Sequence, residues 1–118
     1  KTGFLLAIGT SAPKANLTSM LERLPIQDYF DTCVTSEDVA KSKPAPDTFL
    51  KAAEKLSLSP RRCVVIEDSL QGLDAGKAAG MPVVAVTNTR TRSELAKADL
   101  IVDSLAELNA DDFIKLLK

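Results

Sequence analysis

Apolar and polar positions alternate along this chain in blocks of two kinds. Short runs rich in Val, Ile and Leu, each of strand length, are separated by longer stretches with a helical spacing of apolar residues. Continuous apolar runs are typical of strands that are buried on both faces, as in a parallel sheet. Strands are therefore expected at residues 4–10, 30–35, 63–68, 82–87 and 99–103.

The stretches between these runs predict helices. Two of these helices each show one apolar face. A third helix is predicted from about Leu70 to Ala79, where Gly80 and Pro82 are the signals that end it. The faces of the first two helices, spaced by three or four residues, consist of Leu17, Met20, Leu21 and Leu24, and of Phe49, Ala53 and Leu56.

Two further helices are predicted from capping signals. Thr91 with Glu94 three residues later forms a capping-box pattern for a short fourth helix, and Asn109 is placed to cap a last one. Strand and helix thus alternate throughout, which predicts an α/β fold with a parallel sheet and right-handed crossovers.

Composition narrows this picture. The length of 118 residues, with 45% apolar and 26% charged residues, fits one globular domain. A net charge of -1 without a basic cluster argues against nucleic acid as a partner. Cys33 and Cys63 lie in strand-like runs, which favours buried thiols and a cytoplasmic, disulfide-free protein. The opening apolar run is too short to cross a membrane, and the start at Lys1 suggests a chain cut from something longer.

Polar residues that suit phosphate chemistry stand where the predicted strands end, the edge at which parallel sheets bind ligands. The first strand ends in Gly9, Thr10 and Ser11, which could face a phosphate or simply cap a helix. The third ends in Glu67 and Asp68, adjacent carboxylates that suit Mg²⁺, although Asp68 or Ser69 could instead cap the next helix.

Two more features of the sequence are informative. Lys43 stands in the proline-stiffened sequence Lys-Pro-Ala-Pro-Asp, where it is either an ordered functional lysine or a solvated surface charge. Gly72, Gly76 and Gly80 are spaced by four along one helix face, which indicates close packing of that helix against the sheet.

Taken together, these segments resemble the haloacid dehalogenase (HAD) superfamily, in its β-phosphoglucomutase and phosphoglycolate phosphatase-like branch. Residues 64–81 (VVIEDSLQGLDAGKAAGM) are similar to the branch's fourth motif, residues 42–49 (SKPAPDTF) to the third, and residues 6–16 (LAIGTSAPKAN) to the second. Residues 86–95 resemble the family's loop after the next strand. The resemblance implies a Rossmann-like three-layer core, with residues 1–118 as its C-terminal part.

The resemblance also implies roles for the matching residues. Thr10, where serine is more usual, would bind the phosphoryl group together with Ser11, and Lys43 would pair with that group and with the nucleophile. Asp68 would bind Mg²⁺, and Glu67 would bind it too or orient a bound water. The implied partner is a small phosphorylated metabolite.

The sequence departs from the family in its first motif. The family's nucleophile and its acid-base catalyst form an Asp-x-Asp motif on a first strand, and these 118 residues contain no such triplet. The Asp111-Asp112 pair, at a predicted helix start, is a poor substitute. The substrate-selecting cap is missing as well. We therefore expect a chain that is inactive alone. For the missing central strand we expect, in this order, a strand from the parent protein's N-terminal segment, closure of the two edges on each other, or a strand from a second copy of the chain.

Two other readings compete with a part of a phosphatase or phosphomutase. One is a non-catalytic binding or interaction module derived from the same core. The other is a phospho-receiver domain, which also combines acidic residues, a hydroxyl and a lysine on a parallel sheet. Its order of motifs differs, because here the hydroxyl comes first, then the lysine, then the acidic pair.

Overall fold

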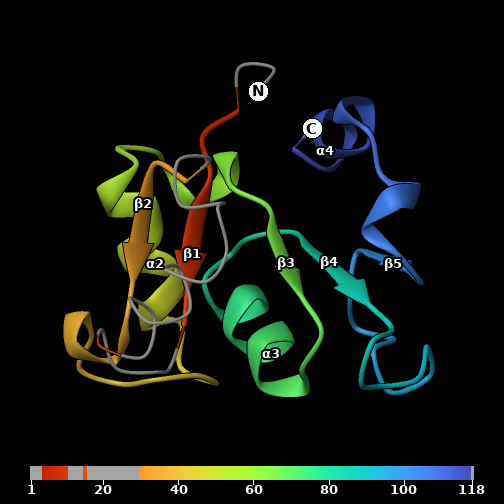
Figure 1. Cartoon of the computed structure of the whole chain (residues 1–118), viewed down its shortest axis with the longest axis horizontal. Helices are drawn as coiled ribbons and strands as arrows, with labels where there is room; N and C mark the ends of the chain where they lie inside the picture. Colours follow the sequence, from red (N-terminus) through yellow and green to blue (C-terminus); the bar gives the residue numbers. More distant parts are fainter. Residues whose placement is uncertain (1–3, 11–14, 16–29, 118) are drawn as a thin grey trace.

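The computed structural model describes residues 4–10, 15 and 30–117, and within them strands and helices alternate as predicted (Figure 1). Each strand lies inside one of the predicted apolar runs but is shorter than it. The strands are β1 (Ala7–Gly9), β2 (Thr32–Val34), β3 (Val65–Glu67), β4 (Val83–Val86) and β5 (Leu100–Val102), and the helices are α2 (Asp47–Lys55), α3 (Leu70–Ala78) and α4 (Ala110–Leu116). Short 3-10 turns are η2 (Ser36–Asp38), η3 (Pro60–Arg62) and η4 (Leu105–Glu107).

All strand pairs are parallel, but the described strands form two sheets rather than one. One sheet has the order β1-β2 and the other β3-β4-β5. In Figure 1, β1 and β3 are the facing edges of the two sheets. This is where the sequence predicts that a central strand is missing, and the two edges have not paired with each other.

The second sheet is covered on both faces, which gives the three layers of an α/β core. Alternate residues of β4 point to opposite faces. Val83 and Ala85 pack in one apolar cluster with Leu73 of α3. Val84 and Val86 belong to another cluster, against which α4 packs. All four residues of β4 are buried, as the continuous apolar run predicts.

Helix α3 confirms the role of two of its glycines and corrects the third. A Cβ at Gly76 would lie 2.6 Å from Val83 Cγ2, and one at Gly72 would overlap Glu67. Both therefore permit the close packing that the sequence predicts. Gly80 has no atom within 4 Å of such a Cβ, so it is not a packing residue. Its φ of 78° instead lets the chain turn just after the helix, as the stop signal predicts.

The predicted helix after Thr91 does not form, although its capping signal works. The Glu94 backbone N–H donates to Thr91 Oγ1 at 3.3 Å, and the Thr91 N–H donates to Glu94 Oε1 at 3.0 Å. The chain nevertheless forms turns there and continues into β5. The chain has already returned to β4 at Asp99, whose backbone N–H donates to the Val83 carbonyl at 2.9 Å, so the turns after Thr91 do not continue as a helix. Asn109 caps α4 as predicted, whereas the helix predicted around residues 17–24 lies outside the described residues.

Several large apolar side chains are exposed at or near the two facing edges. Leu5 is 48% exposed, and Ile66, in the middle of β3, is 44% exposed. A strand of this composition is expected to be covered on both sides, so its exposure is consistent with an incomplete sheet. Among the described residues, no helix is long and apolar enough to cross a membrane.

Candidate functional site

Lys43 brings three of the predicted motifs together at the carboxyl ends of the strands. Its Nζ donates to the Gly9 carbonyl at 3.3 Å and to Glu67 Oε2 at 3.0 Å. The side chain is 12% exposed, and its Nζ lies 4.9 Å from the centre of the Phe49 ring. Pro44, which is joined to Lys43 by a cis peptide bond, stiffens the loop that carries the lysine. Lys43 is therefore held in place by these contacts and is not a solvated surface charge.

Glu67 is held as firmly as Lys43. Its Oε1 accepts hydrogen bonds from the Asp68 backbone N–H at 3.1 Å and from the Ser69 hydroxyl at 3.1 Å, with the Ser69 N–H at 3.4 Å. Burial alone would raise the pKa of Glu67, but the charge of Lys43 and these hydrogen bonds outweigh it and lower the pKa below its ordinary value. Glu67 is accordingly ionised at neutral pH.

The turn from β3 into α3 shows which residue caps the helix. Ser69 is the N-cap, because its Oγ accepts a hydrogen bond from the Gly72 backbone N–H at 2.9 Å. The carboxylate of Asp68 is not used for capping. Of the two capping residues that the sequence left open, the structure selects Ser69, and Asp68 stays available for other chemistry.

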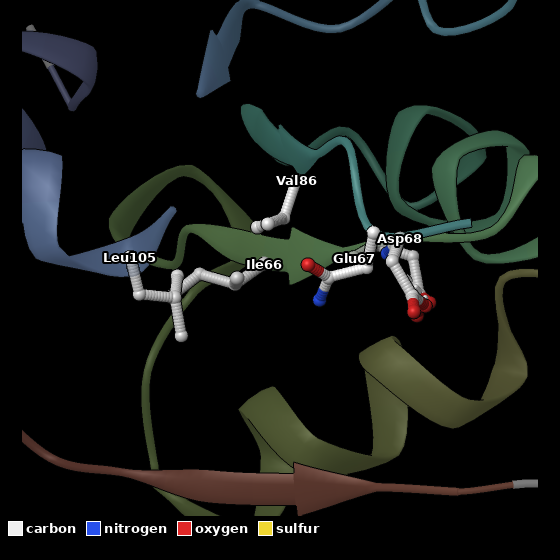
Figure 2. A pocket seen from close by; sticks show the side chains of 6 residues that line it. Ile66, Glu67, Asp68, Val86 and Leu105 are labelled. Atoms are coloured by element: carbon white, nitrogen blue, oxygen red, sulfur yellow. Dashed lines mark hydrogen bonds between the residues drawn. The ribbon is translucent and has the colours of Figure 1, made fainter. Parts of the chain in front are cut away.

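Asp68 opens on a shallow pocket beside the end of β3. The pocket has a volume of about 160 Å³. In Figure 2, Ile66 lies on β3, Leu105 lies beside the start of the strand, and Asp68 follows its end. The residues lining it are Ile66, Glu67, Asp68, Val86, Asn88 and Leu105.

The loop after β4 contributes two residues that sequence reasoning missed. Asn88 lines the same pocket as Asp68, and Thr89 Oγ1 donates to the Asp68 carbonyl at 3.0 Å. The signal was present, because the carboxyl ends of neighbouring parallel strands meet at one edge. The loop was compared with the family as a segment, but no residue in it was given a role.

Thr10 directly follows the end of β1, and its backbone N–H donates to the Val34 carbonyl at 2.9 Å. Thr10 therefore follows directly after Gly9, the residue whose carbonyl Lys43 contacts. Ser11, the other predicted phosphate-binding residue, lies outside the described residues.

The described residues do not by themselves form a complete metal site. Within residues 4–10, 15 and 30–117, no group of three or more His, Cys, Asp or Glu side chains could hold a metal ion. Mg²⁺ commonly takes one or two protein carboxylates and keeps several waters. The carboxylate of Asp68 fits such a site, which needs further ligands from elsewhere.

Comparison with known proteins identifies the family. Residues 1–86 match the model for haloacid dehalogenase-like hydrolases. The chain belongs to this family. Fructose-1-phosphate phosphatase YqaB of Escherichia coli (strain K12) is 42% identical over 81 residues, which cover 69% of this chain and 43% of that protein. The chain spans from 29% to about half of the length of the curated relatives it matches.

Solved structures agree with this family membership. The structure of CbbY from Rhodobacter sphaeroides in complex with phosphate is 35% identical, with a TM-score of 0.83, and the match covers 97% of this chain and 52% of that one. A β-phosphoglucomutase from Clostridium difficile is 34% identical, with a TM-score of 0.77 and coverage of 86% and 44%. The α/β fold and the resemblance to the HAD superfamily are thus confirmed.

Proposed function

We propose that this chain is the C-terminal part of the core of a Mg²⁺-dependent phosphatase or phosphomutase that acts on a small phosphorylated metabolite. The observation that carries the proposal is the contact of Lys43 with both Gly9 and Glu67, directly beside Asp68. A cation and a carboxylate therefore lie at one edge of the fold, where ligands of parallel sheets bind. The names of the relatives, a fructose-1-phosphate phosphatase and a β-phosphoglucomutase, favour a phosphorylated sugar or a similar metabolite.

In this proposal, Lys43 and the end of β1 bind the phosphoryl group. A lysine ammonium has three N–H donors, and its contacts among the described residues use two of them. The third donor serves a phosphoryl oxygen. Thr10 and Ser11 follow β1 and add hydroxyl and backbone N–H groups to the same phosphate.

Asp68 would hold Mg²⁺ next to this phosphate. The ion, when bound, neutralises charge on the phosphoryl oxygens, which is what phosphoryl transfer chiefly requires. One or two protein carboxylates support no more than weak binding, so we expect a dissociation constant of roughly millimolar for the chain alone.

The nucleophile would come from outside this chain. The 118 residues contain no Asp-x-Asp triplet, and β1 and β3 belong to separate sheets. A strand carrying the nucleophilic aspartate, placed between β1 and β3, would bring it next to Lys43. The N-terminal segment of the parent protein is the first choice for this strand, and a second copy of the chain is the other.

Hydrolysis of p-nitrophenyl phosphate and acetyl phosphate tests the proposal. We expect no turnover by the chain alone, and Mg²⁺-dependent turnover after addition of a fragment that carries an Asp-x-Asp strand. The matched control is the same mixture with Asp68→Asn, which should remain inactive. A fragment that binds, as judged by size-exclusion chromatography, without restoring hydrolysis would favour a non-catalytic module. Turnover by the pure chain that depends on Asp68 would refute the external nucleophile.

A further inference from the structure

The loop that follows β4, residues 87–94, contacts the turn that joins β3 to α3. Thr89 of the loop donates a hydrogen bond from its hydroxyl to the backbone carbonyl of Asp68 at 3.0 Å, across 21 positions of sequence. The other hydrogen bond of Asp68 among the described residues lies within the turn, where its N–H donates to Glu67 Oε1 at 3.1 Å. Thr89 is therefore the residue that ties Asp68 to the end of a neighbouring strand.

The peptide group between Asp68 and Ser69 is held on both of its sides. Its N–H donates to Glu67 Oε1 at 3.4 Å, and its carbonyl accepts from Thr89. The contact with Thr89 is the shorter of the two, at 3.0 Å. The peptide group before Asp68 is held as well, through the Asp68 N–H. Because peptide groups are planar, the orientations of the two that meet at Asp68 fix the direction of its Cα–Cβ bond.

The loop is itself anchored, so Thr89 has a fixed support. The Thr87 backbone N–H donates to the Val102 carbonyl at 3.0 Å, and its hydroxyl donates to Asp103 Oδ1 at 2.7 Å. Arg92 Nη2 lies 3.3 Å from Asp103 Oδ2. Such an exposed ion pair contributes little by itself, but Asp103 here holds the loop on both sides of Thr89. The position of the Thr89 hydroxyl is thus set from the end of β5.

We infer that Thr89 is a positioning residue: its hydroxyl fixes the peptide group after Asp68 and thereby the direction in which the Asp68 carboxylate points. The inference rests on the proposed function and deepens it, because it makes the loop after β4 a part of the site. Thr91, in the same loop, has a different position. Its hydroxyl bonds only to Ser93 and Glu94 among the described residues, so it supports the loop without contacting Asp68.

NMR spectroscopy of the metal-free chain tests the contact directly. The readouts are the carbonyl carbon shift of Asp68, which reports the hydrogen bond, and the residual dipolar coupling of its Cα–Cβ bond, which reports the direction. We expect Thr89→Val to change both, because valine keeps the shape of threonine but lacks the hydroxyl. Thr89→Ser restores the hydroxyl and should give values close to those of the wild type. Thr91→Val is the matched control and should leave both readouts unchanged.

Mn²⁺ binding tests the consequence for the site, measured by paramagnetic broadening of the signals of residues 66–69. We expect Thr89→Val to weaken binding about tenfold, as is usual when a residue that orients a metal ligand is lost. Thr89→Ser and Thr91→Val should bind Mn²⁺ as the wild type does. Urea denaturation of the same variants separates this effect from stability. Equal weakening of Mn²⁺ binding by Thr89→Val and Thr91→Val would show that the hydroxyl only stabilises the loop, and would overturn the inference.

The metal-free readouts keep the inference separate from the proposed function. An unchanged Cα–Cβ coupling of Asp68 in Thr89→Val would refute the positioning role, whatever the result with Mn²⁺. A changed coupling in a chain that does not bind Mn²⁺ would support the positioning role and refute the metal part of the proposed function. Thr89→Ala also lacks the hydroxyl and replaces Thr89→Val if that variant does not fold.

Discussion

Strands of both sheets lie in apolar runs, but the central strand of one sheet and the edge strand of the other differ in burial. In the second sheet, all four residues of β4 are buried, with a strand on each side and a helix on each face. In the first sheet, all three residues of β1 are half-buried, and β1 has a neighbouring strand on one side among the described residues. An apolar run therefore specifies a strand, but its burial depends on neighbours that the strand cannot supply itself.

The two sheets are joined at both ends of the facing edges. Lys43 links Gly9, at the end of β1, to Glu67, at the end of β3. At the opposite end, the rings of Phe4 and Phe113 meet edge to face, with centroids 6.0 Å apart and planes at 62°. The strand edges between these contacts have backbone groups that no strand pairs among the described residues. The chain thus keeps the two sheets together without closing the sheet.

Substitution of the buried Leu73, which packs on the sheet β3-β4-β5, should have the largest effect on stability. Leu73 is 1% exposed and packs against the β3-β4 layer, so Leu73→Ala removes buried surface and leaves a cavity. We expect a loss of about 2–5 kcal/mol in the free energy of unfolding. The matched control is Leu50→Ala on α2, where the leucine is 39% exposed and the expected loss is about 1 kcal/mol or less. Urea denaturation measures both free energies of unfolding, and equal losses would show that α2 and α3 are packed alike.

Hydrogen exchange should show the open edges residue by residue. The N–H groups of Thr10 and Val65 donate to carbonyls of neighbouring segments, at 2.9 Å in each case. Because alternate residues of a parallel strand bond to opposite sides, the N–H groups of Gly9 and Ile66 point to the facing edges. We expect Gly9 and Ile66 to exchange faster than Thr10 and Val65.

A peptide that carries an Asp-x-Asp strand should reverse this difference. Binding should protect Gly9 and Ile66 and stabilise the chain by about 1–3 kcal/mol at a large excess of peptide over its dissociation constant. A scrambled peptide is the control. If Ile66 is protected from hydrogen exchange in the chain alone, and the peptide does not change this, the edges of β1 and β3 close on each other in solution. The sheet β1-β2 would then need no added strand.

Two buried threonines beside the sheet β1-β2, one after β2 and one in α2, provide the test with the smallest expected change in stability. Thr35 Oγ1 donates to Asp38 and accepts from the Glu37 N–H, whereas Thr48 Oγ1 is buried without a hydrogen-bond partner among the described residues. Thr48→Val should therefore be neutral or stabilise the chain by about 1 kcal/mol. Thr35→Val should destabilise it by about 1–3 kcal/mol, because its backbone partner loses an acceptor. A loss from Thr48→Val as large as that from Thr35→Val would mean that the Thr48 hydroxyl has a partner in solution.

The sequence by itself determined the order of elements, the family and the positions of the candidate site. Apolar runs placed β1 to β5, Gly80 and Asn109 marked a helix end and a helix start, and the motifs marked Lys43 and Glu67 as candidate site residues. These features are local or repeat a known pattern, so spacing and residue type suffice to find them.

Tertiary structure alone decided the surroundings of each candidate site residue. Capping by Ser69, the fixed Glu67 carboxylate and the available Asp68 carboxylate all follow from the path of the chain between β3 and α3. Adjacent acidic residues look equivalent in a sequence, because spacing does not show which donors surround each one. Likewise, the capping box at Thr91 looked like a helix start, but in the structure the chain returns to β4 at Asp99 and forms only turns before it. Such distinctions depend on contacts between segments that are distant in sequence, and those contacts exist only in the folded chain.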